Sequence, residues 1–311
     1  MTTYTEAPEN FDEFESFVIT GTEEIKDVFF GSKGVFFYDT CSFQRHSGLG
    51  ERERDILTGY FKKRGASVFL TRCVLMELAS DRHSLNNRYI QFLTELNNAG
   101  ANVVIFDEEH TYDILSECFS TNERINEYLM WAVRAANSPV STIRSALDAD
   151  EKLRREVTAG DRLKASDLYR RYFSAVRGKK EQGDDLGEEL IGVCVNILSY
   201  LPGLPDGKLC VLTDDKQDAA AINKIMKATN EHVKGARPLI FSTPKLVQSM
   251  FRENVEMSDE EMESIISQGR PGDVSVMGMT AFDLEVRSKI TMSGAALVKL
   301  MKEPNGINIV F

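Results

Sequence analysis

Short apolar runs and longer periodic stretches follow one another along this chain. The apolar runs are three to five residues long and rich in Val, Phe, Ile and Leu, which is typical of buried strands. We expect strands at 35–38, 67–70, 102–106, 209–212 and 239–241. Apolar residues spaced three or four apart predict helices at 51–64, from about 72, and at 87–99, 185–200, 216–229 and 243–253. This alternation of strand and helix predicts βαβ units, and therefore an α/β fold with a mostly parallel sheet.

One long segment, from about 107 to 182, lacks the strand pattern. It shows helical periodicity at 111–136, 141–158 and 161–177. Pro139 and Gly160 interrupt the pattern, as expected of residues that end helices. We therefore expect a helical insertion within the α/β domain.

The two ends of the chain differ from the middle. Residues 1–30 contain eight acids and the single base Lys26, and we interpret them as an acidic N-terminal leader. The α/β pattern with its insertion fills about 31–255. Residues 256–311 begin with an acidic helical stretch, continue through a Gly/Met/Ser-rich stretch and end in an apolar run at 307–311. We interpret them as a C-terminal extension.

Composition narrows the function classes. No apolar run approaches the roughly 20 residues needed to span a bilayer, and the acidic start does not resemble a secretory signal. We therefore expect a soluble cytoplasmic protein with no membrane partner. The five cysteines and four histidines show no metal-ligand spacing, so a bound metal would need oxygen ligands. The net charge of −11 argues against binding nucleic acid by overall charge, but leaves room for a local basic groove.

Acidic residues gather where predicted strands end or where the next helices begin. They are Asp39, Glu77, the group Asp184, Asp185, Glu188 and Glu189, and the group Asp214, Asp215 and Asp218. Taken singly, an acid in the first turn of a helix is explained by the helix dipole, worth about 0.3–1 kcal/mol. Glu77 differs because it lies between Met76 and Leu78, where a buried carboxylate needs a partner such as a cation.

Together these acids predict a metal site. If strands 35–38 and 209–212 are parallel neighbours, Asp39 and Asp215 leave the same edge of the sheet. The helix after the insertion would add a third acid, with three candidates: Asp185, Glu188 and Glu189. Gathered carboxylates need a compensating charge, and Mg²⁺ or Mn²⁺ is the usual ion for an all-oxygen site. Such a site can activate a water and stabilise the charge on a phosphodiester.

The acidic motifs also resemble those of the PIN domain family, in the order YDTCSF, VLMELA, DDLGEELIGV and VLTDDKQDA. The resemblance implies a three-layer α/β/α sandwich and a metal-dependent endoribonuclease, an activity well known from VapC-type toxins of toxin–antitoxin pairs. It implies catalytic acids at Asp39, Glu77, Asp185, Glu188 and Asp215, of which all but Asp185 would hold the metal. Supporting roles fall to Thr40, Ser42, Thr213, Asp214, Asp218 and Glu189.

The chain departs from a small PIN toxin in two respects. Some 108 positions separate Glu77 from Asp185, which is long for the family, and about 60 residues follow the expected core. Two alternatives therefore stay open: a PIN-like scaffold that no longer cuts, and a flap-type DNA nuclease. The partners expected for the ribonuclease are RNA, a protein antitoxin or regulator, and further copies of the chain in a homo-oligomer.

A basic segment lies within the predicted insertion. Residues 152–180 contain ten Lys/Arg against three Asp/Glu, with aromatic residues among them. Basic residues contact phosphates and aromatic rings stack on unpaired bases. We therefore expect RNA to contact Arg162, Lys164, Arg170, Arg171, Tyr172, Arg177, Lys179 and Lys180. The alternative is an amphipathic helix whose apolar side, including Tyr172, faces the core. A weaker hypothesis is that the acidic leader, the C-terminal tail or an antitoxin-like partner covers this basic segment.

Overall fold

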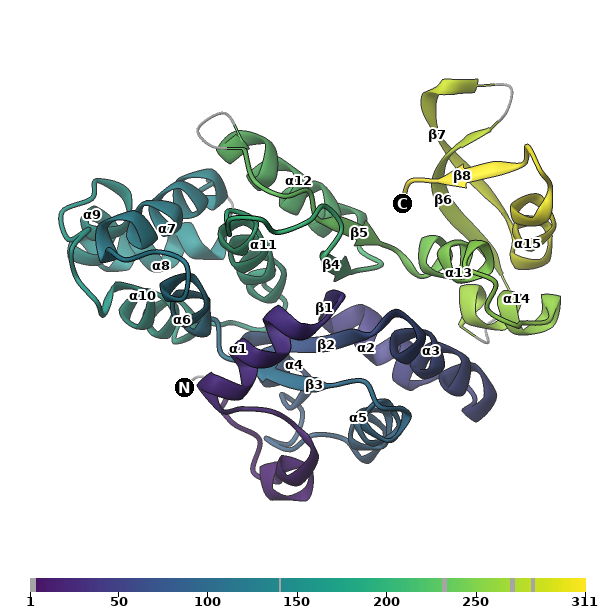
Figure 1. The fold of residues 1–311 in the computed structure, drawn as a ribbon, viewed down its shortest axis with the longest axis horizontal. Coiled ribbons are helices and arrows are strands. Elements are labelled where there is room, and N and C mark those ends of the chain that lie inside the picture. The colour runs from purple at the N-terminus through teal and green to yellow at the C-terminus, as the bar shows by residue number, and fades with distance from the viewer. Residues whose placement is uncertain (1–3, 140, 231–233, 269–271, 281–282) are drawn as a thin grey trace.

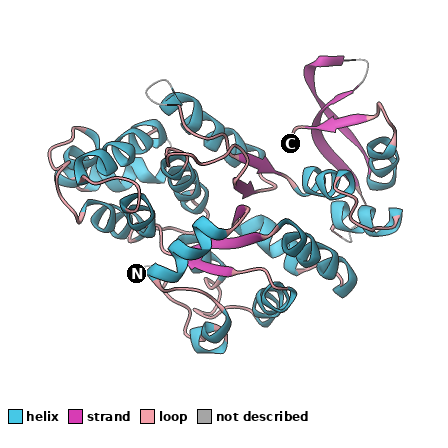
Figure 2. Cartoon of the chain, in the orientation of Figure 1, coloured by secondary structure: helices cyan, strands magenta, loops and turns pink. Residues whose placement is uncertain are grey.

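A five-stranded parallel sheet lies at the centre of the molecule (Figures 1 and 2). The computed structural model describes residues 4–139, 141–230, 234–268, 272–280 and 283–311. The strand order is β3-β2-β1-β4-β5, and every neighbouring pair is parallel. The strands are β1 (Gly34–Tyr38), β2 (Ala66–Thr71), β3 (Val103–Phe106), β4 (Leu209–Leu212) and β5 (Leu239–Phe241). Helices flank the sheet, so the predicted α/β/α class is confirmed.

Six helices in the described α/β part match predicted stretches, whereas those at 22–31 and 40–47 were not predicted. The helices of this part are α1 (Thr22–Gly31), α2 (Thr40–Ser47), α3 (Glu51–Arg64), α4 (Arg72–Leu78), α5 (Asn87–Ala99), α11 (Leu186–Leu198), α12 (Lys216–Asn230) and α13 (Thr243–Arg252). Gly65 and Gly100 end α3 and α5 with φ of 59° and 90°, a conformation that glycine adopts without strain. The bounds predicted for these two helices are therefore confirmed.

The register of the sheet fixes the position of the predicted site. Tyr38, the last residue of β1, pairs with Leu212, the last residue of β4. The expected parallel pairing of these strands is thus confirmed, and Asp39 and Thr213 follow at the same edge. All residues of both strands are buried, which explains the near-continuous apolar runs in the sequence.

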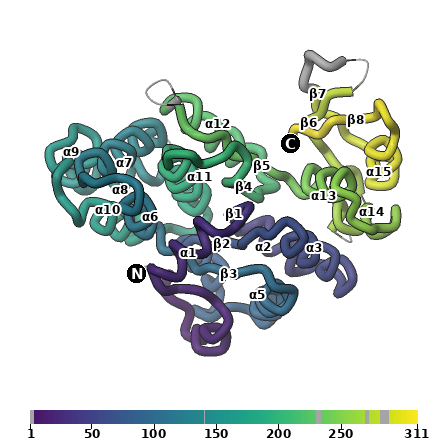
Figure 3. The backbone as a smooth tube through the Cα atoms, viewed as in Figure 1, coloured from purple at the N-terminus to yellow at the C-terminus, as the bar shows by residue number. Residues whose placement is uncertain are grey.

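The insertion is helical, as predicted, and forms one end of the molecule (Figure 3). Its helices are α6 (His110–Ser116), α7 (Asn122–Ala136), α8 (Thr142–Ala149), α9 (Glu151–Thr158) and α10 (Leu168–Arg177). The stretch 111–136 is two helices rather than one, because the chain leaves the helical conformation around 117–121. Helix α7 packs against α11 and α12, so the insertion shares the core of the α/β part.

The N-terminal segment is also part of that core. Two short 3₁₀ turns, Phe11–Glu13 and Glu15–Phe17, precede α1. Phe14, Ile25 and Phe29 are fully buried. Ile19 forms a parallel β-bridge with Val104 at the outer edge of β3. The described part of residues 1–30 is therefore packed against the domain along most of its length.

The C-terminal extension adds a second, antiparallel sheet. It contains α14 (Asp259–Ser267), β6 (Asp273–Thr280), β7 (Asp283–Ser293), α15 (Gly294–Lys302) and β8 (Ile307–Ile309), with strand order β7-β6-β8. Figure 1 shows these elements beyond α13, at the end opposite the insertion. Buried Gln248 of α13 joins the two parts, since its amide bonds the backbone of Ile307 (2.8 Å) and Ile309 (2.9 Å). Among the described residues, no helix has both the length and the apolar character needed to cross a bilayer.

Candidate metal centre

Three carboxylates meet at the carboxyl edge of the central sheet. They belong to Asp39, Glu188 and Asp218, and one oxygen from each lies within 4.8 Å of the other two. Asp39 follows β1, whereas Glu188 and Asp218 lie in the first turns of α11 and α12. Asp39 and Asp218 are buried and Glu188 is partly buried. We call these three residues the acidic triad.

The local sequence fixes the carboxylate of Asp39. The residue is the N-cap of α2, and its Oδ1 accepts a hydrogen bond from the backbone N–H of Cys41 at 2.9 Å. Its Oδ2 accepts from the Cys41 thiol at 2.7 Å. The acid at the end of the first strand is therefore both a helix cap and a member of the triad.

The start of α12 separates two acids that the sequence places one turn apart. Asp215 is exposed, and its Oδ1 accepts from the backbone N–H of Gln217 at 2.6 Å, which caps the helix. The hydroxyl of Thr213 accepts from the backbone N–H of Asp215 at 3.1 Å. Asp218 is buried and points to Asp39. The structure thus brings Asp218, predicted only as a supporting residue, into the triad in place of Asp215.

The structure also separates the three candidates for the third acid. Asp185 is exposed just before α11. The carboxylate of Glu189 accepts from the backbone N–H groups of Thr142 (3.2 Å) and Ile143 (3.0 Å), so it caps α8 of the insertion. Only Glu188, among these three, lies in the triad.

Asp214 and Ser42 hold the edge of the sheet together. Asp214 accepts from the backbone N–H and the hydroxyl of Thr243, both at 2.7 Å, and from the Ser42 hydroxyl at 3.4 Å. Arg45 lies 3.3 Å from the same carboxylate. The Thr243 hydroxyl is also 2.9 Å from Nε2 of His46, whose pKa is lowered to about 4 by burial. Asp214 therefore ties β4 to α2 and α13, and its oxygens are already engaged.

Glu77 lies beside the triad but has other partners. Its Oε2 accepts from the Thr40 hydroxyl, and its Oε1 is 2.7 Å from the ammonium of Lys180. Lys180 also pairs with Asp184 and is buried. Burial opposes the charged form of Lys180, but the carboxylates of Glu77 and Asp184 outweigh it and raise its pKa. From the sequence we expect Glu77 to have a cationic partner, and in the structure this cation is Lys180.

Among the described residues, the charges that most affect Glu188 and Asp218 of the triad are other carboxylates. Burial first, and then the carboxylates of Glu77, Asp39 and Asp218, raise the pKa of Glu188 to about 10. Burial, followed by Asp215 and Asp39, raises the pKa of Asp218 to about 7. Ionised carboxylates this close repel one another unless a cation lies between them. The all-oxygen set and its crowding fit a small divalent ion such as Mg²⁺ or Mn²⁺.

These pKa shifts predict how stability depends on pH. Because the folded pKa values of Asp218 and Glu188 lie above their ordinary values near 4, the folded state binds protons more tightly than the unfolded state. Metal-free protein should therefore lose stability as pH rises from about 4 through 7 toward 10. A bound divalent ion removes this cost, so millimolar Mg²⁺ should raise the melting temperature by several degrees at pH 8 and by less at pH 5. Thermal melts with NaCl of equal ionic strength are the control, and equal shifts at both pH values would contradict the prediction.

Most of the predicted RNA-contacting residues are paired or buried. Arg177 is 5% exposed and pairs with Glu108 and Asp107. Tyr172 is fully buried, so its ring is not available for stacking on a base, and the alternative of a core-facing helix holds for it. Further members of the set are placed as follows: Arg162 pairs with Glu156 and Asp167, Arg171 pairs with Glu156, and Lys164, Arg170 and Lys179 are exposed.

The leader contacts this basic segment through two residues. Glu6 is 3.2 Å from the guanidinium of Arg177, and the ring of Tyr4 lies 5.6 Å from the Lys180 ammonium. Neither contact follows from local sequence signals, because each joins positions more than 170 residues apart. In the described part of the leader, Glu6 and Tyr4 therefore contact two buried cations of the basic segment.

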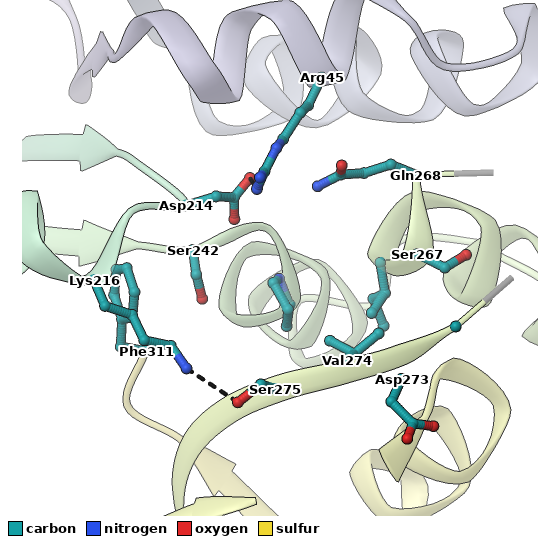
Figure 4. Close-up of a pocket in the computed structure, with 13 residues that line it drawn as sticks. Arg45, Asp214, Lys216, Ser242, Ser267, Gln268, Asp273, Val274, Ser275 and Phe311 are labelled. Atoms are coloured by element: carbon teal, nitrogen blue, oxygen red, sulfur yellow. Dashed lines mark hydrogen bonds and ion pairs between the residues drawn. The ribbon is translucent and has the colours of Figure 1, made fainter. Parts of the chain in front are cut away.

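Two cavities flank the centre. One, of about 530 Å³, opens beside Glu77. Its lining combines uncharged polar side chains, from Asn10, Gln44, Ser80, Ser84, Asn86 and Asn87, with charged ones, from Glu13, Glu77, Asp81 and Arg82. We call it the amide groove. The other, of about 380 Å³, lies between the sheet edge and the C-terminal extension (Figure 4). There Arg45 points to Asp214, and Lys216 bonds Ser275 at 3.1 Å.

Comparisons of this chain with protein-family models, with curated proteins and with solved structures found no match.

Proposed function

We propose that this protein is a metal-dependent nuclease that hydrolyses phosphodiester bonds in RNA, with a PIN-like fold. The observation that carries the proposal is the acidic triad, in which three carboxylates from separate segments meet within 4.8 Å. Such crowding costs stability unless a cation is bound, as the raised pKa of Glu188 indicates. A fold that only served as a scaffold would gain nothing from retaining this cost.

Asp39, Glu188 and Asp218 would hold the ion. Bound there, Mg²⁺ or Mn²⁺ would supply positive charge for the phosphodiester and make an attacking water more acidic. The chain itself contributes the positions of the ligands. Cys41 fixes Asp39, and the first turns of α11 and α12 present Glu188 and Asp218 to the same point.

The amide groove favours a single-stranded nucleic acid as the substrate, and the resemblance to PIN ribonucleases favours RNA. Amide and hydroxyl side chains donate and accept hydrogen bonds at the edges of unpaired bases, which is the common mode of single-stranded RNA recognition. The groove includes Glu77, which lies beside the triad, so a strand bound in it would pass close to the metal. The order of acidic motifs, which resembles that of PIN ribonucleases, supports the same substrate.

We place this activity in the cytoplasm. All five cysteines are free thiols in the structure, as expected of a protein from a reducing compartment.

The test is cleavage of single-stranded and structured RNAs by the purified protein. We expect cleavage with millimolar Mn²⁺ or Mg²⁺, loss of cleavage with EDTA, and a drop on the order of 100-fold or more for Asp39→Asn. Asp12→Asn removes the same charge from an exposed position and should cut normally. Cleavage that survives both EDTA and Asp39→Asn would rule out the metal mechanism. Cleavage of DNA but not RNA, in parallel digestions, would reassign the substrate.

A further inference from the structure

Both oxygens of the Glu77 carboxylate already have a partner within the chain. The Thr40 hydroxyl donates to its Oε2, and the Lys180 ammonium lies 2.7 Å from its Oε1. The backbone of Gly187 lies against the same carboxylate, since a Cβ at this glycine would be only 2.8 Å from Oε1. The Glu77 carboxylate is thus surrounded by Thr40, Lys180 and Gly187. Gly187 directly precedes Glu188, a member of the triad.

Lys180 is built into this position. Its side chain is 2% exposed, and its ammonium contacts two carboxylates, those of Glu77 and Asp184. It also bonds the carbonyl oxygen of Asp184 at 3.1 Å. The ammonium therefore has three oxygen partners, which equals its number of N–H donors. A side chain so enclosed has a fixed location, unlike a surface lysine.

We infer that the Lys180 ammonium takes the place of a second divalent cation, so that the centre holds one metal ion, coordinated by Asp39, Glu188 and Asp218. This inference rests on the proposed metal-dependent function and specifies its metal requirement. The resemblance to PIN domains implied Glu77 as a metal ligand, and the geometry points to a different role for it. Glu77 positions Lys180, and Lys180 neutralises Glu77.

Electrostatics supports a single ion. A second Mg²⁺ or Mn²⁺ at Glu77 would lie about 2.1 Å from one of its oxygens. The nearby ammonium, 2.7 Å from Oε1, would then face a doubly charged ion at short range in a buried environment. Repulsion between such charges is strong where water is excluded. The triad, which has no cation of its own within hydrogen-bonding distance in the described residues, is where the first ion would bind.

The number of bound ions tests the inference without reference to activity. We expect Mn²⁺ titration, followed by calorimetry and by electron paramagnetic resonance, to give one ion per chain. Glu77→Gln should still bind one ion per chain, because Glu77 is not a ligand and Lys180 retains Asp184. Two ions in the unmodified protein, or loss of the ion in Glu77→Gln, would overturn the inference. Binding of no ion at all would overturn the proposed metal centre as well, which separates the two failures.

Removal of the lysine provides the complementary result. Lys180→Ala leaves Glu77 and Asp184 without their cation, and we expect a second Mn²⁺ to bind, with the exchange-coupled spectrum of a close ion pair. Lys179→Ala, a change at the exposed neighbouring residue, should still bind one ion. A single uncoupled ion in folded Lys180→Ala protein would contradict the inference. Should this variant fail to fold, the Glu77→Gln titration decides the question alone.

Discussion

Replacement of Asp218 by Asn should lower Mn²⁺ affinity and RNA cleavage by on the order of 100-fold, because it removes one of the three proposed metal ligands. Replacement of Asp215 by Asn should leave both within about threefold, because this exposed carboxylate is screened by solvent and can still cap α12 through its amide oxygen. The two residues lie one helical turn apart and the substitutions are chemically identical. The pair therefore isolates the position of the carboxylate as the variable.

The comparison should be made by titrating Mn²⁺ into each variant and by measuring initial rates on one RNA. Both variants should melt within a few degrees of the unmodified protein when metal-free, and Asp218→Asn should be the more stable at pH 8 since it removes a crowded charge. A larger loss for Asp215→Asn than for Asp218→Asn would show that Asp215, and not the buried Asp218, binds the ion.

Replacement of Arg177 by Met should destabilise the fold by about 3–5 kcal/mol, the range for removing one partner of a buried ion pair. Its guanidinium lies 2.6 Å from Glu108 and 2.8 Å from Asp107, directly after β3. Burial raises the pKa of Glu108, and Arg177 opposes that rise. Without the arginine, the buried Glu108 would lose its cation, whereas Asp107 would keep Arg72 at 3.3 Å.

Urea unfolding of metal-free protein measures this effect. Arg170→Met, an exposed change on the same helix, should alter the free energy of unfolding by less than about 0.5 kcal/mol. The loss for Arg177→Met should be smaller at pH 5 than at pH 8, because protonation of Glu108 removes the unpaired charge. A loss below about 1 kcal/mol at pH 8 would mean that the ion pair is open to solvent.

The central sheet could be predicted from sequence because its signals are local. Each parallel strand is buried on both faces and reads as a continuous apolar run, and glycines mark the ends of α3 and α5. The antiparallel strands β6 and β7 were not predicted. In β6 most residues are only partly buried, so the Gly/Met/Ser-rich stretch lacks a strong apolar alternation.

The sequence named two members of the triad, Asp39 and Glu188, as metal ligands, but named Asp218 only as a supporting residue. The predicted strand order places Asp39, the start of α11 and the start of α12 at the same edge of the central sheet. The choice between Asp215 and Asp218 depends on where β4 ends and α12 begins, to within one turn. Glu189, unlike Glu188, caps α8. The sequence does not show this, because the backbone groups that it caps lie almost 50 positions away.

The basic segment shows why charge counts mislead within a short window. Arg177 and Lys180 are buried against acids from other parts of the chain, namely Asp107, Glu108 and Glu77. A local excess of Lys/Arg predicts a surface for phosphates only if the rest of the chain supplies no counter-charge. Here the counter-charges lie about 70 to 100 positions upstream.

The bridge between Ile19 and Val104 has a consequence for the assembly state of the protein. Strand β3 is the outermost strand on its side of the sheet, and its free N–H and C=O groups could pair with another chain. Ile19 occupies them, accepting from the N–H of Ile105 at 3.0 Å and donating to the carbonyl of Val103 at 2.8 Å. The N-terminal segment therefore covers part of this edge and leaves fewer backbone groups there for another chain to pair with.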